Sequence, residues 1–346
     1  AEAPSGPEGE AFSSRQELNA SYERQREALI AEFKKRDDQL EDRREADLAA
    51  LAARQKGAEA EATYRELFYR AINRRDHEAA AKGARQYLDA GRTDLELEAL
   101  ATYILALAEA ERDQDEKAIE HLQAFLKRHP SADANRKIPP ETIFAVGEAF
   151  LQHLIRAGRY DSARKVCELF LSGDPDPAVK QHFQGRKAQL DLLGEPAPAI
   201  AGKDVDGETV RLADWKGKVI LVNFWATWCP PCLADIPHLQ SLYARYHNKG
   251  LEILGVNVDA EREGVGDRSQ ARAKVRRFLI EAGIRWPNLL NGEGPDDFTQ
   301  TYHVTSIPAA FLIDRQGQIV EIESRGQALE RAIAKAFGDE EKKGED

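Results

Sequence analysis

Val219-Ile220-Leu221-Val222-Asn223-Phe224-Trp225, which leads through three more residues into Cys229-Pro230-Pro231-Cys232, is the stretch that decides the fold. Its first part is rich in β-branched and aromatic residues and predicts a buried strand. Leu233 to Tyr246 follow with apolar residues at helical spacing, so the cysteine pair lies at a strand-to-helix turn. Free backbone N–H groups and the helix dipole at such a turn should lower the pKa of the first cysteine. Two thiols one helical turn apart can close a disulfide, so the stretch predicts thiol–disulfide exchange.

A metal site and a purely structural disulfide are the other uses of such a cysteine pair. A zinc site needs a second pair of ligands, whereas the only other cysteine is the distant Cys167 and no paired-histidine pattern is present. A disulfide across two intervening residues closes so short a loop that it would constrain the unfolded chain little. We therefore expect redox chemistry, no metal, and no cofactor beyond the redox-active Cys229–Cys232 disulfide.

Three stretches around this pair carry a family resemblance. They run from Leu212 to Cys232, from Gly250 to Asp259 and from Ser306 to Gly317, and together they resemble the TlpA/ResA-type thioredoxin-like disulfide reductases. The resemblance covers roughly residues 195–338 and implies a thioredoxin-like α/β domain there. It also implies that Pro308 is cis and faces the cysteines, and that the backbone before it, at Ile307, holds an extended segment of the substrate.

The residues of the motif are expected to play different parts. Cys229, at the exposed end of the helix, should be the attacking thiolate, and Cys232 should be the resolving thiol that breaks the mixed disulfide. Pro230 and Pro231 lack N–H groups and suit the first helical turn, so they should tune the pair by leaving fewer donors near the sulfur than a Gly-Pro linker. Trp228 is expected to contact the substrate, although an aromatic here could equally pack on its own domain.

One position departs from thioredoxin itself, which carries a buried aspartate six residues before its first cysteine. Asn223 stands there in this chain, and an amide cannot take up the proton of the second thiol. Asp259, at the end of the next predicted strand, and Asp235, one turn after Cys232, are candidates for this role. Acids at such positions are more often plain surface residues, so the proton acceptor stays open.

Composition excludes one class of partner and bears on the compartment. The 346 residues suffice for two domains, and a net charge of −11 with a pI near 5.4 argues against nucleic acid. No apolar run reaches the length of a membrane span. The chain contains no methionine, so we expect that Ala1 is not a translation start and that a signal peptide, an anchor or other residues once preceded it. Because the family it resembles is mostly exported and often membrane-tethered, we expect an extracytoplasmic protein, periplasmic or exported, with any membrane anchor in a segment absent from this chain.

The N-terminal part predicts a leader and one long helix. Residues 1–12 are rich in Pro, Gly, Glu and Ala and are expected to be disordered. Residues 13–56 contain no proline or glycine and predict a long charged helix. Its apolar residues Leu18, Leu29, Leu40 and Leu51 recur every eleven residues, with Tyr22 and Phe33 alongside. Eleven residues make close to three turns, so they form one narrow stripe. The stripe predicts packing on the protein's own domain or, alternatively, a homodimer through residues 13–56.

Residues 57–194 predict helical hairpins that resemble tetratricopeptide units. Ala80, Ala118 and Ala163 are each followed seven and eight residues later by an aromatic residue and a leucine. The spacings of 38 and 45 residues exceed the 34 of that repeat, so a regular superhelical groove does not follow. Such a region can be a docking or dimerisation platform, and we expect it to add selectivity rather than chemistry. Its lone Cys167 is expected to be a packing residue.

Gly and Pro between Asp191 and Ala199 mark a domain boundary. Beyond it, strands are expected at 219–225, 251–258, 309–314 and 318–323, with helices at 270–282 and 328–337, before a charged tail at 339–346. The fold class is therefore an all-α helical-repeat region followed by an α/β thioredoxin-like domain.

The function expected from these features is a thiol–disulfide oxidoreductase that reduces protein disulfides. Its partners would be protein thiol or disulfide substrates and an upstream thiol electron donor. A peroxiredoxin-like peroxidase is one alternative, although that chemistry needs a cysteine within P-x-x-x-T/S-x-x-C rather than C-x-x-C. The other alternative is a helical-repeat binding module with an accessory thioredoxin domain.

Overall fold

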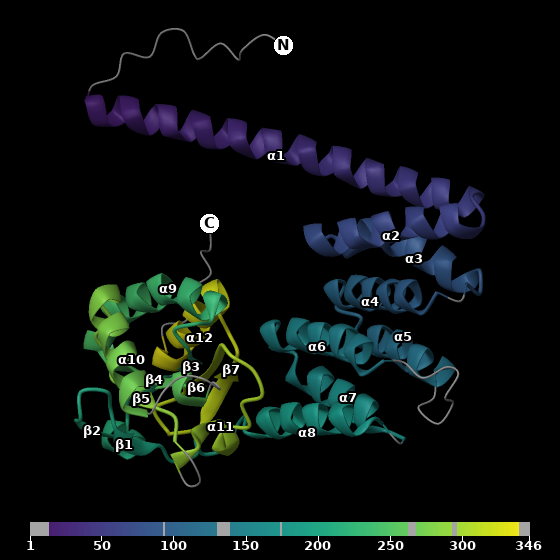
Figure 1. Cartoon of the computed structure of the whole chain (residues 1–346). Helices are drawn as coiled ribbons and strands as arrows, with labels where there is room; N and C mark the ends of the chain where they lie inside the picture. Colours follow the sequence, from purple (N-terminus) through teal and green to yellow (C-terminus); the bar gives the residue numbers. More distant parts are fainter. Residues whose placement is uncertain are drawn as a thin grey trace. The chain divides into compact units, whose positions relative to one another are not determined.

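The computed structural model describes residues 14–92, 94–129, 139–173, 175–261, 268–292 and 296–338 (Figure 1). The predicted leader and the charged tail lie outside these ranges. The chain divides into two compact units, Ala1–Ala108 and Glu109–Asp346. None of the described helices is long and apolar enough to span a membrane.

The first unit is all-helical, as predicted. It contains α1 (Arg15–Arg54), α2 (Gly57–Arg74), α3 (His77–Asp89) and most of α4 (Leu95–Glu111). α1 begins after Ser14, whose hydroxyl accepts the backbone N–H of Glu17. α3 approaches α1 and α2 closely at Gly83, where a Cβ would lie 2.5 Å from Leu67 and 3.2 Å from Ala49. A glycine at this position therefore permits the close packing.

The two faces of α1 have different surroundings. Its buried residues are Glu45, Ala49 and Ala52, and small alanines let the helix approach its neighbours closely. The eleven-residue stripe lies on roughly the opposite face of the helix, given a period of about 3.6 residues, and it is exposed: Phe33 is 73 % and Leu40 is 64 % exposed. α1 does pack on its own unit, as one of the two alternatives expected, but it does so through this alanine face and not through the stripe.

The helical part of the second unit consists of four helices. They are α5 (Asp115–Arg128), α6 (Pro140–Arg156), α7 (Tyr160–Leu171) and α8 (Pro177–Asp191). The small residues Ala118 and Ala163 of the predicted repeat are fully buried here, and so is Cys167. α6 packs so closely that a Cβ on Gly147 would lie 2.7 Å from Phe183. The repeat pattern thus predicted correctly which side chains face the interior.

A five-stranded sheet forms the centre of the α/β part, in the order β5-β4-β3-β6-β7. Its strands are β3 (Val219–Trp225), β4 (Leu251–Asn257), β5 (Asn288–Leu290), β6 (Ala309–Ile313) and β7 (Ile319–Ile322). β3, β4 and β5 are parallel, whereas β6 and β7 join antiparallel. A small hairpin of β1 (Ala201–Lys203) and β2 (Thr209–Arg211) precedes the sheet in the chain.

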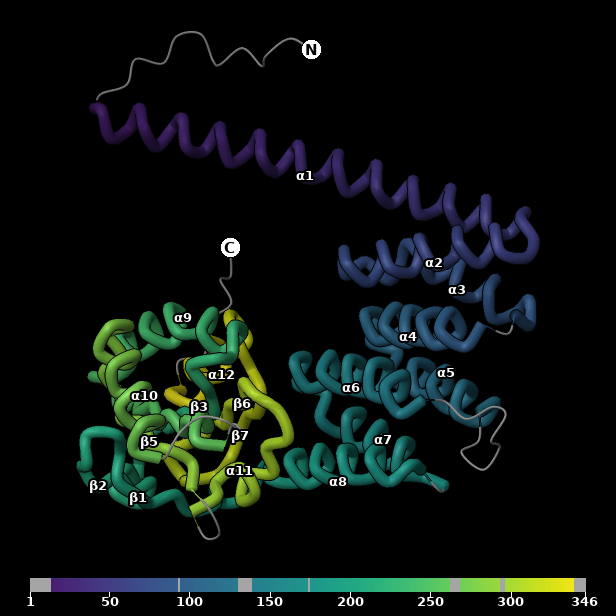
Figure 2. The backbone as a smooth tube through the Cα atoms, viewed as in Figure 1, coloured from purple at the N-terminus to yellow at the C-terminus, as the bar shows by residue number. Residues whose placement is uncertain are grey.

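Helices cover both faces of this sheet. α9 (Pro230–Tyr246) and α12 (Gly326–Phe337) share one apolar cluster with β3 and β4 and lie together in Figure 2. On the other face, Phe224 of β3 contacts the ring of Tyr302, which follows α11 (Phe298–Thr301). α10 (Arg268–Ala282) lies on the same face as α9, because its Val275 and Leu279 share a cluster with both cysteines and with Trp225, whose side chain points away from that of Phe224. The second unit therefore contains the predicted thioredoxin-like α/β fold.

Candidate active site

The cysteine pair lies where β3 passes into α9, as predicted. Cys229 is the N-cap of α9, and a disulfide joins it to Cys232, with the two Cα atoms 5.3 Å apart. Pro230 and Pro231 occupy the start of the helix and have no N–H to donate. The N–H of Cys232 donates to the sulfur of Cys229 over 3.3 Å. This sulfur therefore receives a backbone hydrogen bond at the positive end of a helix dipole.

Both sulfurs are covered in the disulfide form. Cys229 is 4 % and Cys232 is 3 % exposed, so the expectation that Cys229 lies at an exposed helix end is not met. An apolar cluster that includes Trp225 shields the two cysteines from solvent. The half-buried Ile307 packs against this cluster. Trp228, just before the pair, is 39 % exposed.

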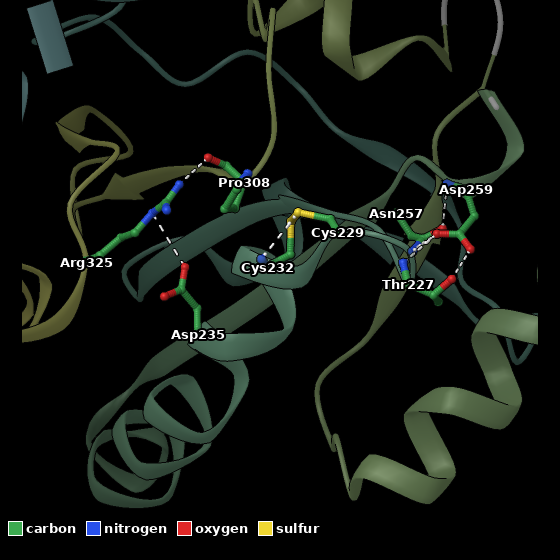
Figure 3. Close-up of a disulfide and its surroundings, with 8 residues drawn as sticks. All are labelled: Thr227, Cys229, Cys232, Asp235, Asn257, Asp259, Pro308 and Arg325. Carbon is green, nitrogen blue, oxygen red and sulfur yellow. Dashed lines mark hydrogen bonds and ion pairs between the residues drawn. A yellow bond between two sulfur atoms is a disulfide. The ribbon is translucent and has the colours of Figure 1, made fainter. Parts of the chain in front are cut away.

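The Ile307–Pro308 peptide bond is cis, as the resemblance implies. β6 begins at the next residue and runs antiparallel to β3, with Ala309 opposite Phe224. Because Phe224 lies near the end of β3, just ahead of the cysteine turn, this register brings Pro308 next to the disulfide (Figure 3).

Asp259 anchors the turn that leads to Cys229. It is fully buried, and its carboxylate accepts the backbone N–H of Thr227 at 2.7 Å as well as the Thr227 hydroxyl. The amide of Asn257 and the ammonium of Lys274 each donate to it at 3.1 Å. Burial alone would raise the pKa of Asp259, but these donors outweigh it and hold the pKa below its usual value. Asp259 is thus an ionised structural anchor rather than a surface acid.

Asp235 lies on the other side of the pair, one turn after Cys232 in α9 (Figure 3). With Asn223 and Pro308 it lines a small cavity of about 10 Å³ between α9, β3 and the start of β6. Burial raises the pKa of Asp235, against the opposing charges of Arg325, His238 and Arg156. Of the two candidate acids, Asp235 alone combines a raised pKa with a place beside the cis-proline.

Arg325 belongs to the site although the sequence analysis did not single it out. It lies between β7 and α12, and its guanidinium donates to the carbonyl oxygen of Pro308. Its Nε is 3.5 Å from a carboxylate oxygen of Asp235. One side chain thus joins the cis-proline to the acid (Figure 3). No spacing rule in the sequence connects these three residues, because only the sheet topology brings them together.

Comparisons with known proteins agree with this geometry. The Redoxin family profile matches residues 192–336. The thiol-disulfide oxidoreductase ResA of Bacillus thuringiensis (strain Al Hakam) is 32 % identical over 158 residues, which cover 46 % of this chain and 84 % of that protein. The protein of the same name from Geobacillus thermodenitrificans is 33 % identical over 159 residues, with coverage of 46 % and 84 %.

Solved structures also match the C-terminal part. The thioredoxin domain of a thiol-disulfide oxidoreductase from Bacteroides vulgatus is 33 % identical, covers 41 % of this chain and 96 % of that chain, and gives a TM-score of 0.36. A putative thiol:disulfide interchange protein DsbE from Chlorobium tepidum is 29 % identical, with coverage of 42 % and 98 % and a TM-score of 0.37.

Proposed function

The chain belongs to the ResA family of thiol-disulfide oxidoreductases, and from this premise we propose that it reduces disulfides of protein substrates through Cys229 and Cys232. The observation that carries the proposal is the place of Cys229. Its sulfur caps α9, accepts the N–H of Cys232 and lies next to cis-Pro308. A thiolate is favoured at such a position, and a thiolate is the species that attacks a disulfide.

The reaction proceeds by two exchanges of sulfur. In the dithiol form, the Cys229 thiolate attacks one sulfur of the substrate disulfide, that S–S bond breaks, and a substrate thiolate leaves. Cys232 then loses its proton and attacks the Cys229 sulfur, which releases the second substrate thiol and forms the Cys229–Cys232 disulfide. Two electrons pass to the substrate. An upstream thiol donor then reduces the Cys229–Cys232 disulfide by the same kind of exchange and restores the dithiol form.

Asp235 is our choice for the acceptor of the Cys232 proton. It follows Cys232 by one helical turn, and burial raises its pKa toward the range in which a carboxylate can take up and return a proton. Asp259 is unsuited, because four donors hold it ionised. Asn223 lines the same cavity as Asp235 but carries no titratable group.

The substrate segment is proposed to lie across Trp228, Ile307 and Pro308. Trp228 offers an exposed aromatic face beside the pair. The ladder between β3 and β6 starts at Ala309, so Ile307 lies outside it. We propose that the backbone there pairs with an extended peptide, a form of strand addition.

Single-cysteine variants test these roles. Reduced Cys232→Ser protein should capture insulin, a protein with accessible disulfides, as a mixed disulfide that persists on a non-reducing gel, because no thiol remains to resolve it. Cys229→Ser protein should not capture it, and Cys167→Ser should behave like the unchanged chain. Equal capture by Cys229→Ser would reverse the two roles. A wild-type protein that leaves insulin disulfides intact would remove the reductase proposal itself.

We place this reaction outside the cytoplasm. Protein disulfides form and persist mainly in oxidising compartments, so a reductase of such bonds has its substrates there. Fractionation of cells that express the full-length protein from its own gene should recover it in the periplasm or on the outer side of the membrane. Recovery only in the cytoplasm would contradict this placement.

The helical region is proposed to serve as a dimerisation platform through α1. The stripe of six large apolar residues extends over 34 residues from Leu18 to Leu51, about 50 Å of helix at 1.5 Å per residue. It points away from the alanine face that packs on α2 and α3. Exposed apolar surface on this scale marks an interaction site. Residues 13–56 contain ten acidic and ten basic residues, so the segment carries no net charge that would repel a second copy.

An antiparallel arrangement of two α1 helices suits the apolar stripe. With the two-fold axis between Lys34 and Lys35, Leu29 lies across from Leu40 of the second copy. The same register sets Leu18 across from Leu51, so the leucines of the stripe face one another along its length. A second copy of this chain is therefore the occupant that complements the stripe in its apolar residues.

Sedimentation of the full chain tests this platform. The protein should sediment as a dimer, and Phe33→Glu should convert it to a monomer, whereas Ala28→Glu, on the exposed side of α1 away from the stripe, should leave it dimeric. In a Cys229→Ser/Cys232→Ser background, oxidation should join two copies strongly through F33C and weakly through L18C. Position 33 lies near the centre of an antiparallel pair, where the two copies of one residue meet, whereas position 18 lies far from it. A monomeric parent protein would overturn the proposal.

A further inference from the structure

The segment that carries Arg325 is held by the helices of the second unit. Glu323, two residues before Arg325, is paired with Arg186 of α8 through two hydrogen bonds, of 2.5 and 3.1 Å. Arg186 is only 1 % exposed, and its Nε is 3.2 Å from Glu148 of α6. The hydroxyl of Tyr160 in α7 donates to Glu321 of β7. Polar contacts from α7 and α8 therefore converge on Glu321 and Glu323, and Glu148 of α6 supports them through Arg186.

The conformation of Glu323 links this network to the active site. Its φ of 55° lies in the left-handed region, which a non-glycine residue adopts at a cost. Its N–H donates to Ala310 of β6 over 2.7 Å, which fixes it against the strand that begins after Pro308. With its carboxylate held by Arg186 and its N–H held by β6, Glu323 determines where the chain leaves β7. Arg325 follows two residues later.

We propose that Arg186 is a positioning residue of the redox site: by holding Glu323, it places the Arg325 guanidinium between Asp235 and the carbonyl of Pro308. The proposal rests on the reductase function argued above and deepens it. The helices α6 and α8 then form part of the active-site scaffold and are not a separable docking module, which departs from the expectation that the helical half adds only selectivity.

Arginine is the residue type that this arrangement needs at 325. Its planar guanidinium offers five N–H donors in a fixed fork, so one group can bind a carbonyl and face a carboxylate together. A lysine ammonium is a point charge on a flexible stem and would hold one of the two less firmly. The charges that face Asp235 are Arg325, His238 of α9 and Arg156 of α6. Of these, Arg325 forms an ion pair with Asp235, and its Nε lies 3.5 Å from a carboxylate oxygen.

The effect on chemistry follows from the charge of Arg325. Burial raises the pKa of Asp235, and the positive charge of Arg325 opposes that rise. If Arg325 moves away, the pKa of Asp235 climbs further, and the carboxylate form that accepts the Cys232 proton is reached only at higher pH. The curve of reduction rate against pH should therefore keep its shape, while its rise on the acidic side moves to higher pH.

The experiment measures insulin reduction by the full chain from pH 4 to pH 8. Arg325→Gln should move the acidic limb up by roughly 0.5 to 1 pH unit, since an opposite charge within about 4–6 Å shifts a carboxyl pKa by about that much or more. Arg186→Lys should move it in the same direction by less, and should add nothing in the Arg325→Gln background, because both act through one side chain. Asp235→Asn should lower the rate and remove the part of the limb that titrates with Asp235, so that only the titration of the Cys229 thiol remains and Arg325→Gln no longer shifts the profile in that background.

Two further variants make the result decisive. Arg164→Lys replaces a half-buried arginine of α7 whose ion pairs and hydrogen bond go to Asp161, Asp191 and the Leu190 carbonyl, and it should leave the profile unchanged. Glu323→Gln should reproduce the shift of Arg186→Lys, and it serves if Arg186→Lys does not fold.

The outcomes separate this inference from the proposed function. A folded Arg186→Lys or Glu323→Gln protein with the wild-type pH profile would overturn the positioning role while leaving the reductase intact. A chain whose Cys229→Ser variant still reduces insulin would instead overturn the reductase proposal.

Discussion

Two acidic residues near the cysteine pair receive opposite roles from their surroundings. Asp259 is buried among donors and stays ionised, whereas Asp235 is half-buried with a raised pKa. The difference is not in the residue type but in the number of donors, which is four for Asp259. A charged hydrogen-bond acceptor is costly to bury without such donors, so Asp259 is suited to hold a turn and Asp235 to exchange a proton.

Asp259→Asn should destabilise the second unit in a pH-dependent manner. The folded pKa of Asp259 lies below the ordinary value of 3.8, so its contribution is present above that pH and is lost as the pH falls through the folded pKa. We expect a loss of about 1–3 kcal/mol in the free energy of unfolding at pH 7, from the weakened charged hydrogen bonds. Urea unfolding at pH 7 and at pH 3 measures this, and a loss that is equal at both values would argue against an ionised anchor.

Cys167 should be chemically inert in the folded protein. Burial raises its pKa to about 12, so only about one thiol in ten thousand is ionised at pH 8, and the side chain has no exposed surface. Iodoacetamide at pH 8, with the Cys229–Cys232 disulfide intact, should label the native chain at least a hundredfold more slowly than the chain in urea. Rapid stoichiometric labelling of the native protein would show that α7 opens readily.

The residues that the sequence predicted and those that it missed differ in how they are positioned. Cys229, Cys232 and Pro230 act within one turn of chain, so their spacing was sufficient evidence. Pro308 came from the family resemblance. The place of Arg325 in the site depends on how β6, β7 and α9 pack together. A single sequence does not show which of its distant elements are in contact.

At the scale of elements, length decides what a pattern can predict. β3 and β4 have seven residues each, enough for an apolar run to be recognised, and α10 and α12 were expected within two residues of their ends. β1, β2, β5 and α11 have three or four residues, too few for a period of 2 or 3.6 to show. These short elements are specified by their neighbours in the sheet rather than by their own sequence.

Gly147→Ala should destabilise the protein, contrary to the intrinsic preference of helices for alanine. A Cβ on this α6 residue would lie 2.7 Å from Phe183 and 2.8 Å from Phe170, whose rings stack at 4.5 Å. We expect a loss of about 1–3 kcal/mol from overpacking, which exceeds the gain of about 1 kcal/mol for alanine over glycine in a helix. A raised thermal midpoint would mean that α6 and α8 are less tightly packed than the structure has them.

At the scale of the whole molecule, the division into units and the sequence-based boundary fall at different places. Composition changes at 191–199, where the helical pattern ends and the Redoxin match begins nearby. The compact units instead meet between Ala108 and Glu109, because contacts such as Arg186–Glu323 tie the later helices to the sheet. Composition shows where the local pattern changes along the chain. It does not show contacts between distant segments, and these contacts decide which residues form one compact unit.

The reduction potential of the Cys229–Cys232 pair tests the central claim, that this chain donates electrons to disulfides, most directly. Equilibration of the full chain with graded ratios of reduced and oxidised glutathione, followed by alkylation and mass spectrometry, gives the value. We predict a potential more negative than about −200 mV, in the range of glutaredoxins and thioredoxin. A potential near about −120 mV, typical of a strong oxidant, would contradict it.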